Sequence, residues 1–299
     1  MLKIALGPLL YYWPRQTTFD FYEAMAQTSV DTVYLGETVC SRRHELRLAD
    51  WLQIAALLRA RGKDVVLSTQ TLLESGAEVG TMHKIAANGD YLVEANDMGA
   101  VQSLTGKVPF VAGPHLNIYN VPTLQWMAGL GASRWVMPLE MKQSDLAVMQ
   151  AGRGTLQTEV FAYGRMPLAF SARCFTARHC NLPKDDCQFS CLAHPDGLMM
   201  KTRESEEFLV LNGTQTQSAR VYNLIGAVGS MQALGVDVVR LSPQSQNMAQ
   251  VVALFRATID GALTPAQAVE RITPLMPAQG CNGYWHGQPG LDLVAQPVQ

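Results

Sequence analysis

The sequence contains little charge and no long stretch of one residue type. Only 16% of its 299 residues are charged, and the formal net charge is −2. No basic run is present, so the composition favours neither a nucleic-acid partner nor an anionic membrane surface. No apolar stretch approaches the roughly 18 residues of a membrane-spanning helix. We therefore expect a cytoplasmic protein without a membrane span.

Several enzyme motifs are also missing. The chain contains neither an H-E-x-x-H zinc motif nor a G-x-S-x-G nucleophile motif. The sequence leaves a cysteine nucleophile as an alternative, because the histidine that activates such a cysteine need only be near it in space. The apolar start LKIALGPLLYYWPR is short, contains Gly7 and Pro8 and lacks a small-residue cleavage site. It predicts a buried first strand rather than a signal peptide.

Cysteine is scarce except in one stretch, residues 166–191, which holds Cys174, Cys180, Cys187 and Cys191. Disulfides need an oxidising compartment, which nothing in the sequence indicates. The spacing fits structural zinc loosely, since only the last two cysteines form a close C-x3-C pair. An iron–sulfur cluster needs four converging thiolates, one of them often distant in sequence. The spacing favours a cluster over zinc, with unligated thiols as the third alternative.

Short apolar strands alternate with amphipathic helices along the chain, which predicts an α/β fold with a parallel sheet. Eight such units in about 260 residues match a (β/α)8 TIM-like barrel in count and length. The alternative is an open doubly wound sheet, but GPLLYYWP after the first strand is no dinucleotide fingerprint. The predicted strands are 3–8, 32–36, 65–69, 91–95, 110–113, 134–138, 159–164 and 237–243, within a single domain covering 1–299.

The barrel predicts where chemistry occurs, because sites in this fold lie at the C-terminal ends of the strands. Cys40 follows the second strand. An insertion at about 165–217, after the seventh strand, carries the other clustered cysteines, and a helix is expected near 218–234. The length of the insertion lets it reach Cys40. Cys281 precedes the turn dipeptide Asn-Gly and is expected to be an unligated thiol.

The segments YLGETVCSRR, FVAGPHLNIYN, RWVMPLEM, YGRMPLAFSARCFTARH, PKDDC, FLVLNG, DVVRLSPQ and CNGYW resemble the UbiV-type members of the collagenase-like peptidase family. The resemblance covers nearly the whole chain. It implies a [4Fe–4S] cluster whose ligands, matched by position, are Cys40, Cys174, Cys187 and Cys191. The family pattern requires no ligand at Cys180. We interpret this cysteine as a spectator near the cluster, and as the first replacement for any one of the four assigned ligands.

The same resemblance implies a function. Proteins of this type pair with a UbiU-like partner in oxygen-independent hydroxylation during ubiquinone biosynthesis, alongside a lipid-binding accessory protein. Prephenate is the implied oxygen source, and prenylated phenol intermediates are the implied substrates. Two alternatives stay open: a structural iron–sulfur partner without chemistry of its own, and a hydrolase (peptidase).

Polar residues near the ends of the predicted strands are candidates for a pocket, although each can instead cap a helix or satisfy buried backbone. Arginines near the cysteines can offset the negative charge of a thiolate cluster, or bind a dicarboxylate. For the first role we consider Arg42, Arg43, Arg173 and Arg178, each of which can instead be an ordinary solvated surface residue. The candidate pocket residues are Glu37, Arg42, Glu94, His115, Asn117, Glu140, Tyr163, Arg173 and Arg240.

Overall fold

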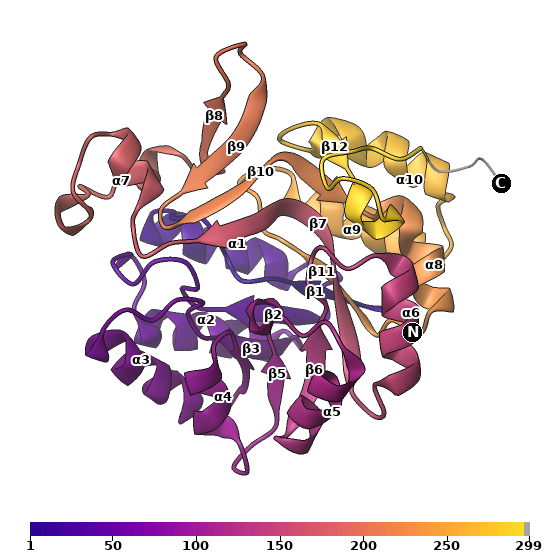
Figure 1. Ribbon diagram of the computed structural model, residues 1–299, viewed down its shortest axis with the longest axis horizontal. Coiled ribbons are helices and arrows are strands. Elements are labelled where there is room, and N and C mark those ends of the chain that lie inside the picture. Colours follow the sequence, from indigo (N-terminus) through magenta and orange to yellow (C-terminus); the bar gives the residue numbers. More distant parts are fainter. Residues whose placement is uncertain (296–299) are drawn as a thin grey trace.

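Eight parallel strands pair in sequence order and close into a barrel (Figure 1). The computed structural model describes residues 1–295. The barrel closes because the last strand pairs with both the seventh and the first, placing Val238 opposite Glu159 on one side and Lys3 on the other. The (β/α)8 prediction is confirmed. The strands are β1 (Lys3–Leu6), β2 (Thr32–Leu35), β3 (Asp64–Ser68), β4 (Leu92–Ala95), β5 (Phe110–Ala112), β6 (Ala132–Val136), β7 (Gln157–Phe170) and β11 (Val238–Leu241).

Helices cover the outside of the barrel, because each presents an apolar face to strands that are buried on both sides. The core face of α9 is an example, since Met248, Val251, Val252, Phe255 and Ile259 are all buried. The helices are α1 (Arg15–Ala26), α2 (Leu48–Ala60), α3 (Gly76–Ala86), α4 (Met98–Leu104), α5 (Val121–Gly129), α6 (Gln143–Gly152), α8 (Val228–Ala233), α9 (Met248–Ile259) and α10 (Pro265–Ile272).

Local capping fixes where several helices begin. Ser75 accepts the backbone N–H of Glu78, and the Glu78 carboxylate accepts the backbone N–H of Ser75 at 2.8 Å. This reciprocal pair satisfies two donors that the first turn of α3 leaves free. Thr264 and Gln267 form the same arrangement at the start of α10. Each cap contributes on the order of 1 kcal/mol to helix stability.

The segment after the barrel part of β7 forms a second, antiparallel layer. β7 continues to Phe170 and pairs with β10 (Gln215–Asn223), which pairs with β9 (Glu207–Asn212) and through it with β8 (Leu198–Lys201). The cysteines lie at three short elements: Cys174 and Cys180 flank α7 (Phe175–His179), Cys187 follows η2 (Lys184–Asp186), and Cys191 lies in η3 (Ser190–Ala193). In Figure 1, α7 and the β8–β9 hairpin project from one end of the barrel.

The prediction of a helix near 218–234 is wrong for the first part of that range. Residues 215–223 are strand β10, and only η4 (Ile225–Ala227) and α8 that follow are helical. The extended β7 offers a free edge, and antiparallel pairing with that edge satisfies the backbone of these residues. The remaining short elements are η1 (Pro114–Leu116), η5 (Thr273–Leu275), β12 (Gly280–Cys281) and η6 (Gly283–His286). None of the helices within residues 1–295 has the length and apolar character that crossing a membrane requires.

Candidate functional site

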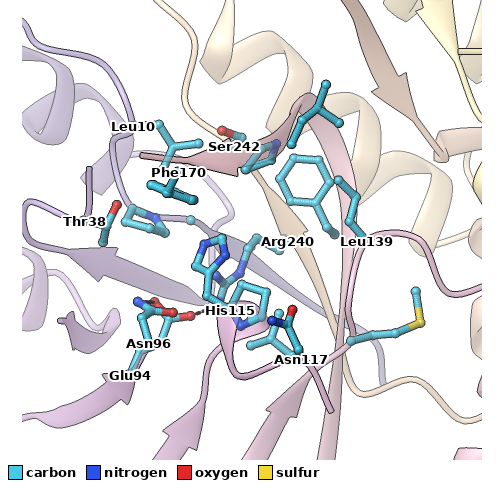
Figure 2. Close-up of a pocket in the computed structure, with 18 of the residues that line it drawn as sticks. Leu10, Thr38, Glu94, Asn96, His115, Asn117, Leu139, Phe170, Arg240 and Ser242 are labelled. Atoms are coloured by element: carbon cyan, nitrogen blue, oxygen red, sulfur yellow. Dashed lines mark hydrogen bonds and ion pairs between the residues drawn. The ribbon is translucent and has the colours of Figure 1, made fainter. Parts of the chain in front are cut away.

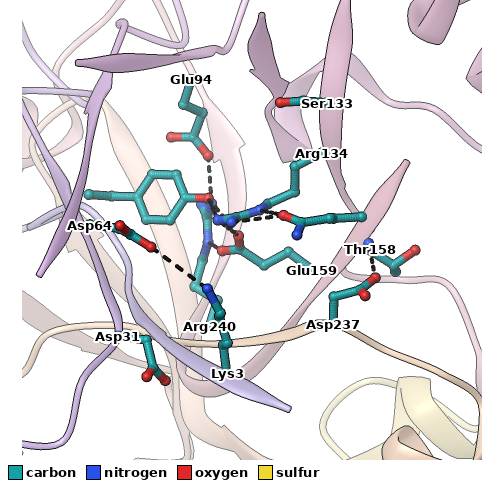
Figure 3. A network of polar contacts seen from close by, with 12 residues as sticks. Lys3, Asp31, Asp64, Glu94, Ser133, Arg134, Thr158, Glu159, Asp237 and Arg240 are labelled. Carbon is teal, nitrogen blue, oxygen red and sulfur yellow. Dashed lines mark hydrogen bonds and ion pairs between the residues drawn. The ribbon is translucent and has the colours of Figure 1, made fainter. Parts of the chain in front are cut away.

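A network of buried charges occupies the interior of the barrel (Figure 3). Arg240 Nε donates to Glu159 Oε1 at 2.5 Å, and Arg240 Nη2 lies 2.7 Å from Glu94 Oε1. Arg134 Nη1 donates to Glu159 Oε2 at 3.2 Å, and the Tyr34 hydroxyl donates to the same oxygen at 2.5 Å. These residues come from five different strands, so the network links opposite walls of the barrel.

The formal charges of this network cancel, because two guanidiniums face two carboxylates. Burial raises the pKa of Glu159, but the guanidiniums of Arg240 and Arg134 more than offset it, so the pKa lies below its usual range. The pKa of Arg240 is raised well above normal by Glu159 and Glu94, despite burial. Glu159 and Arg240 are therefore ionised near neutral pH. Buried ion pairs are weak evidence for stability, so the network points to a role at the site.

A pocket opens at the C-terminal ends of the strands and shares Glu94 and Arg240 with this network (Figure 2). It contains about 850 Å³ of empty space, including space open to solvent. Its walls are largely apolar and include Leu10, Val136, Met137, Leu139, Phe161 and Phe170.

Four buried polar atoms around this pocket have no hydrogen-bond partner in the described residues: Thr38 Oγ1, Glu94 Oε1, Asn96 Oδ1 and Arg240 Nη2. The residues are 2%, 0%, 3% and 4% exposed. Arg240 Nη2 is close to Glu94 but is not aligned with it for a hydrogen bond. An unpaired buried polar atom costs about 1–3 kcal/mol. A ligand or water that pairs with these atoms is therefore favoured.

His115 adds a neutral imidazole to the pocket. Burial and the nearby positive charge of Arg240 lower the pKa of His115 to about 4. Its ring meets the edge of the Phe170 ring at a centroid distance of 4.8 Å. At neutral pH this side chain can donate one hydrogen bond and accept another without adding charge.

Five of the predicted pocket residues line this pocket: Glu94, His115, Asn117, Glu140 and Arg240. The others lie elsewhere. Arg42 lines the cysteine recess, and Glu37 lies beside it, bonded to the Cys40 loop. Arg173 is exposed, with its backbone N–H bonded to Ser171.

Tyr163 is buried outside the pocket. Its hydroxyl donates to Gln244 at 2.7 Å, and its ring packs against Phe255 of α9. The pairing of β7 with β11 is shifted between the partners of Arg240 and Leu241, where one extra β7 residue is inserted. This bulge turns Tyr163 to the outer face although Phe161, two residues earlier, lines the pocket.

A second recess lies under the insertion, and four cysteines from distant positions line it: Cys40, Cys174, Cys187 and Cys191. It contains about 300 Å³ of empty space, including open solvent. All six cysteines are free thiols. Within residues 1–295, no three metal-binding side chains converge on a point that suits one ion. A four-iron cluster makes a different demand, because each thiolate binds a different iron.

Local backbone structure aims these cysteines at the recess. Cys174 is the N-cap of α7, and its Sγ accepts the backbone N–H of Ala177 at 3.4 Å. Between Cys187 and Cys191, two consecutive residues, Gln188 and Phe189, have φ values of 50° and 51°. Side chains other than glycine rarely adopt this left-handed region, at a cost of about 1–3 kcal/mol each, and such strain gathers at functional sites.

Burial favours the protonated form of two of these thiols, Cys40 and Cys191. Burial raises the pKa of Cys40 to about 11, although Arg43 lowers it in part. Burial likewise raises the pKa of Cys191, with Arg43 again opposing the shift. Metal binding at this recess would therefore release protons. A set of four thiols beside a buried guanidinium fits the chemistry of a [4Fe–4S] cluster, which supplies one-electron redox chemistry when bound.

The recess and the pocket share a wall. Leu10, Val39 and Cys40 form one buried apolar cluster, against which Phe170 packs. Leu10 and Phe170 also line the barrel pocket, whereas Cys40 lines the recess. One layer of side chains separates the two sites.

The remaining cysteines lie apart from the recess. Cys180 is exposed at the end of α7 and does not line it. Cys281 is fully buried in β12, which pairs with β10 in the core. Both cysteines therefore lie outside the recess.

The sequence analysis did not identify several site residues, among them Tyr34, Arg134 and Glu159 of the network and Thr38 and Asn96 of the pocket. A signal for two of them was present. Arg134 and Glu159 are charges within otherwise apolar strands, and such residues must face a polar partner inside the fold. Thr38 and Asn96 carry no comparable signal, because small polar residues are common in loops.

The family model described as Peptidase family U32 matches residues 17–293. The chain belongs to peptidase family U32. The family-level part of the resemblance read from the sequence is thereby confirmed.

Two curated relatives of this U32 chain are both named tRNA hydroxylation protein P, from Helicobacter pylori strains ATCC 700392 / 26695 and J99 / ATCC 700824. Each is 24% identical over 211 residues, which cover 64% of this chain and 49% of the relative. The chain thus spans about half the length of the curated relatives it matches.

Solved structures with a similar fold share little sequence with this U32 chain. Plasmodium falciparum HPPK-DHPS wild type has a TM-score of 0.42 at 10% identity, covering 88% of this chain and 46% of that one. The spore coat polysaccharide biosynthesis protein spsE from Bacillus subtilis also has a TM-score of 0.42 at 10% identity, covering 98% and 75%. These similarities carry no functional argument.

Proposed function

We propose that this chain is the [4Fe–4S] subunit of an oxygen-independent hydroxylase that acts on aromatic-ring intermediates of ubiquinone biosynthesis. It works in complex with a UbiU-like partner, and a lipid-binding accessory protein presents the substrate. The four ligands are Cys40, Cys174, Cys187 and Cys191. The observation that carries the proposal is that these four thiols, one from the β2 loop and three from the insertion, line one recess.

The shared wall between recess and pocket favours a redox role over a purely structural one. Leu10 and Phe170 contact both the Cys40 cluster of side chains and the pocket. An electron carrier in the recess would therefore lie close to a ligand in the pocket. A cluster needed only for folding has no reason to adjoin a ligand pocket.

The pocket suits the proposed ligands. Its apolar walls match an aromatic or prenylated ring. Arg240 Nη2 and the neutral His115 can bind a hydroxyl, a carbonyl or one carboxylate of prephenate, the proposed oxygen source. The roles of these residues are to bind, orient and exclude water.

The family's curated relatives support hydroxylation as the reaction type, because their names refer to it. Their tRNA substrate is not favoured for this chain. A formal net charge of −2 and the absence of a basic run provide no electrostatic surface for a polyanion. The peptidase alternative is less well supported than hydroxylation, because the names of these relatives refer to hydroxylation and not to peptide cleavage.

The decisive experiment is anaerobic purification with and without the UbiU-like protein, followed by assay of iron, sulfide and redox state. We expect about four iron and four sulfide per chain and a signal on reduction. Co-expression with the partner should increase solubility. A chain that holds no iron under either condition would refute the proposal.

A pocket variant separates the redox role from the structural alternative. Leu139 is half-buried in the pocket wall, away from the cysteines. Leu139→Trp should retain full iron but abolish ubiquinone formation in cells grown without oxygen. Full ubiquinone formation with a filled pocket would favour a structural cluster, with the chemistry in the other subunit.

A further inference from the structure

Arg43 lines the cysteine recess, beside Cys40 of the β2 loop and the cysteines of the insertion. It is 4% exposed, and its guanidinium is held from several sides. Nη1 donates to the carbonyl of Leu10 at 2.7 Å, and Nη2 donates to Asn212 Oδ1 at 2.7 Å. Its Nε is buried and has no hydrogen-bond partner in the described residues. The side chain thus joins the β1 loop, its own β2 loop and the end of β9.

Arg43 faces both parts of the recess. It lines the recess together with Cys40 from the β2 loop and Cys191 from the insertion. Glu37 Oε1 is 3.6 Å from Nη1, and the same oxygen accepts the backbone N–H of Cys40 at 3.0 Å. One carboxylate thus links this arginine to the Cys40 loop.

The other arginines near the cysteines are placed differently. The Arg42 side chain is 39% exposed and donates to the carbonyl of Asp185 at 2.6 Å. Arg173 and Arg178 are exposed. Water and salt screen exposed charges, whereas a buried charge acts at full strength over short distances.

We propose that Arg43 is a positioning residue for the cluster: it holds the Cys40 loop against the β1 loop and the end of β9, and raises the reduction potential with its buried charge. The inference rests on the proposed cluster. Adding an electron makes a thiolate-bound cluster more negative, so a fixed neighbouring cation stabilises the reduced state. Glu37 acts in the opposite direction, because its negative charge partly cancels that of Arg43.

The test compares Arg43→Gln, Glu37→Gln and the control Arg178→Gln in the full chain, reconstituted anaerobically and titrated potentiometrically at pH 8. We expect Arg43→Gln to shift the reduction equilibrium at least tenfold toward the oxidised form, about 59 mV for one electron. Glu37→Gln should shift it toward the reduced form, and Arg178→Gln should leave it unchanged. A merely structural role would not give opposite signs.

An unchanged potential in Arg43→Gln, or a lowered one in Glu37→Gln, would overturn the inference. If Arg43→Gln fails to hold iron, the Glu37→Gln variant tests the proposal alone: a shift toward the reduced form supports it, and a shift toward the oxidised form contradicts it. If the wild-type cluster resists reduction, the rate of iron removal by a chelator replaces the titration. Iron should then leave Arg43→Gln at least tenfold faster than Arg178→Gln, and equal rates would contradict the proposal. Wild-type protein without iron refutes the cluster itself instead.

Discussion

Glu37 Oε1 accepts the backbone N–H of Cys40 at 3.0 Å, and thereby fixes the loop that follows β2. The same oxygen accepts the N–H of Val39 at 2.9 Å. A single carboxylate therefore sets the direction of the one candidate ligand that does not belong to the insertion. The shape of the recess depends on this short loop as much as on the cysteine-rich segment.

Replacing single cysteines should separate ligands from spectators. Cys174→Ser should lose most of the iron and the visible absorbance of the cluster, because it removes one of four thiolates. Cys180→Ser should retain both, since Cys180 is exposed away from the recess. Iron and sulfide assays on anaerobically purified protein measure the difference. If both variants keep full iron, the ligand set is wrong.

Cys281→Ser should keep its iron but lose stability. Cys281 is fully buried beside β10, and a serine hydroxyl there has no partner in place. We expect a loss of about 1–3 kcal/mol in the free energy of unfolding. Urea unfolding of the iron-loaded protein tests this. A loss of iron at unchanged stability would assign Cys281 to the cluster.

Removing one charge from the barrel network should be costly. Glu159→Gln leaves two buried guanidiniums facing a single carboxylate, and we expect a loss of about 3–5 kcal/mol. Asp64→Asn is the matched control, because Asp64 is exposed and lies 3.8 Å from Lys3. Such surface pairs contribute about 0–1 kcal/mol. Equal effects of the two substitutions in urea unfolding would contradict this account.

The same network predicts a pH dependence. Arg240 and Arg134 lower the pKa of Glu159 in the folded chain. Stability from this group is therefore present above the unfolded pKa, about 4.3, and is lost as pH falls through the lower folded pKa. The difference in stability between wild type and Glu159→Gln should be constant from pH 7 to 5 and shrink below about 4. A difference that disappears already at pH 6 would refute the assignment.

His115 should make the protein less stable in mild acid. Its folded pKa of about 4 is below the ordinary unfolded value. The unfolded chain thus binds the proton first, and stability falls as pH drops from about 7 toward 4. Between pH 8 and 5 the loss is about 2 kcal/mol. His115→Gln should remove this loss in urea unfolding, whereas His83→Gln, an exposed control, should not.

Gly36 should tolerate no side chain. Its φ is 129°, and an added Cβ would lie 2.7 Å from the carbonyl oxygen of Ser68. Gly36→Ala should cost about 1–3 kcal/mol through strain and also displace the Glu37–Cys40 loop, lowering iron content. Gly62→Ala controls for backbone strain, since Gly62 has φ 76° and no atom within 4 Å of an added Cβ. Equal stability losses would show that the contact with Ser68 is unimportant.

The sequence by itself determined the barrel. Apolar strands such as 65–69 and 110–113 are buried on both faces, and only helices on the outside can cover them, so strand count and spacing fix the architecture. The sequence also placed Cys40 at the end of a barrel strand and Cys174 in an insertion. Both placements follow from the order of the residues along the chain.

Only the tertiary structure decided which side chains meet. The bulge that turns Tyr163 away from the pocket depends on the pairing of β7 with β11. Residues 215–223 form a strand because they pair with the free edge of β7. Arg43 could not be distinguished from Arg42 in sequence, because adjacent residues share their local context. Their burial differs only once the insertion folds over the barrel, and burial determines how strongly a charge acts.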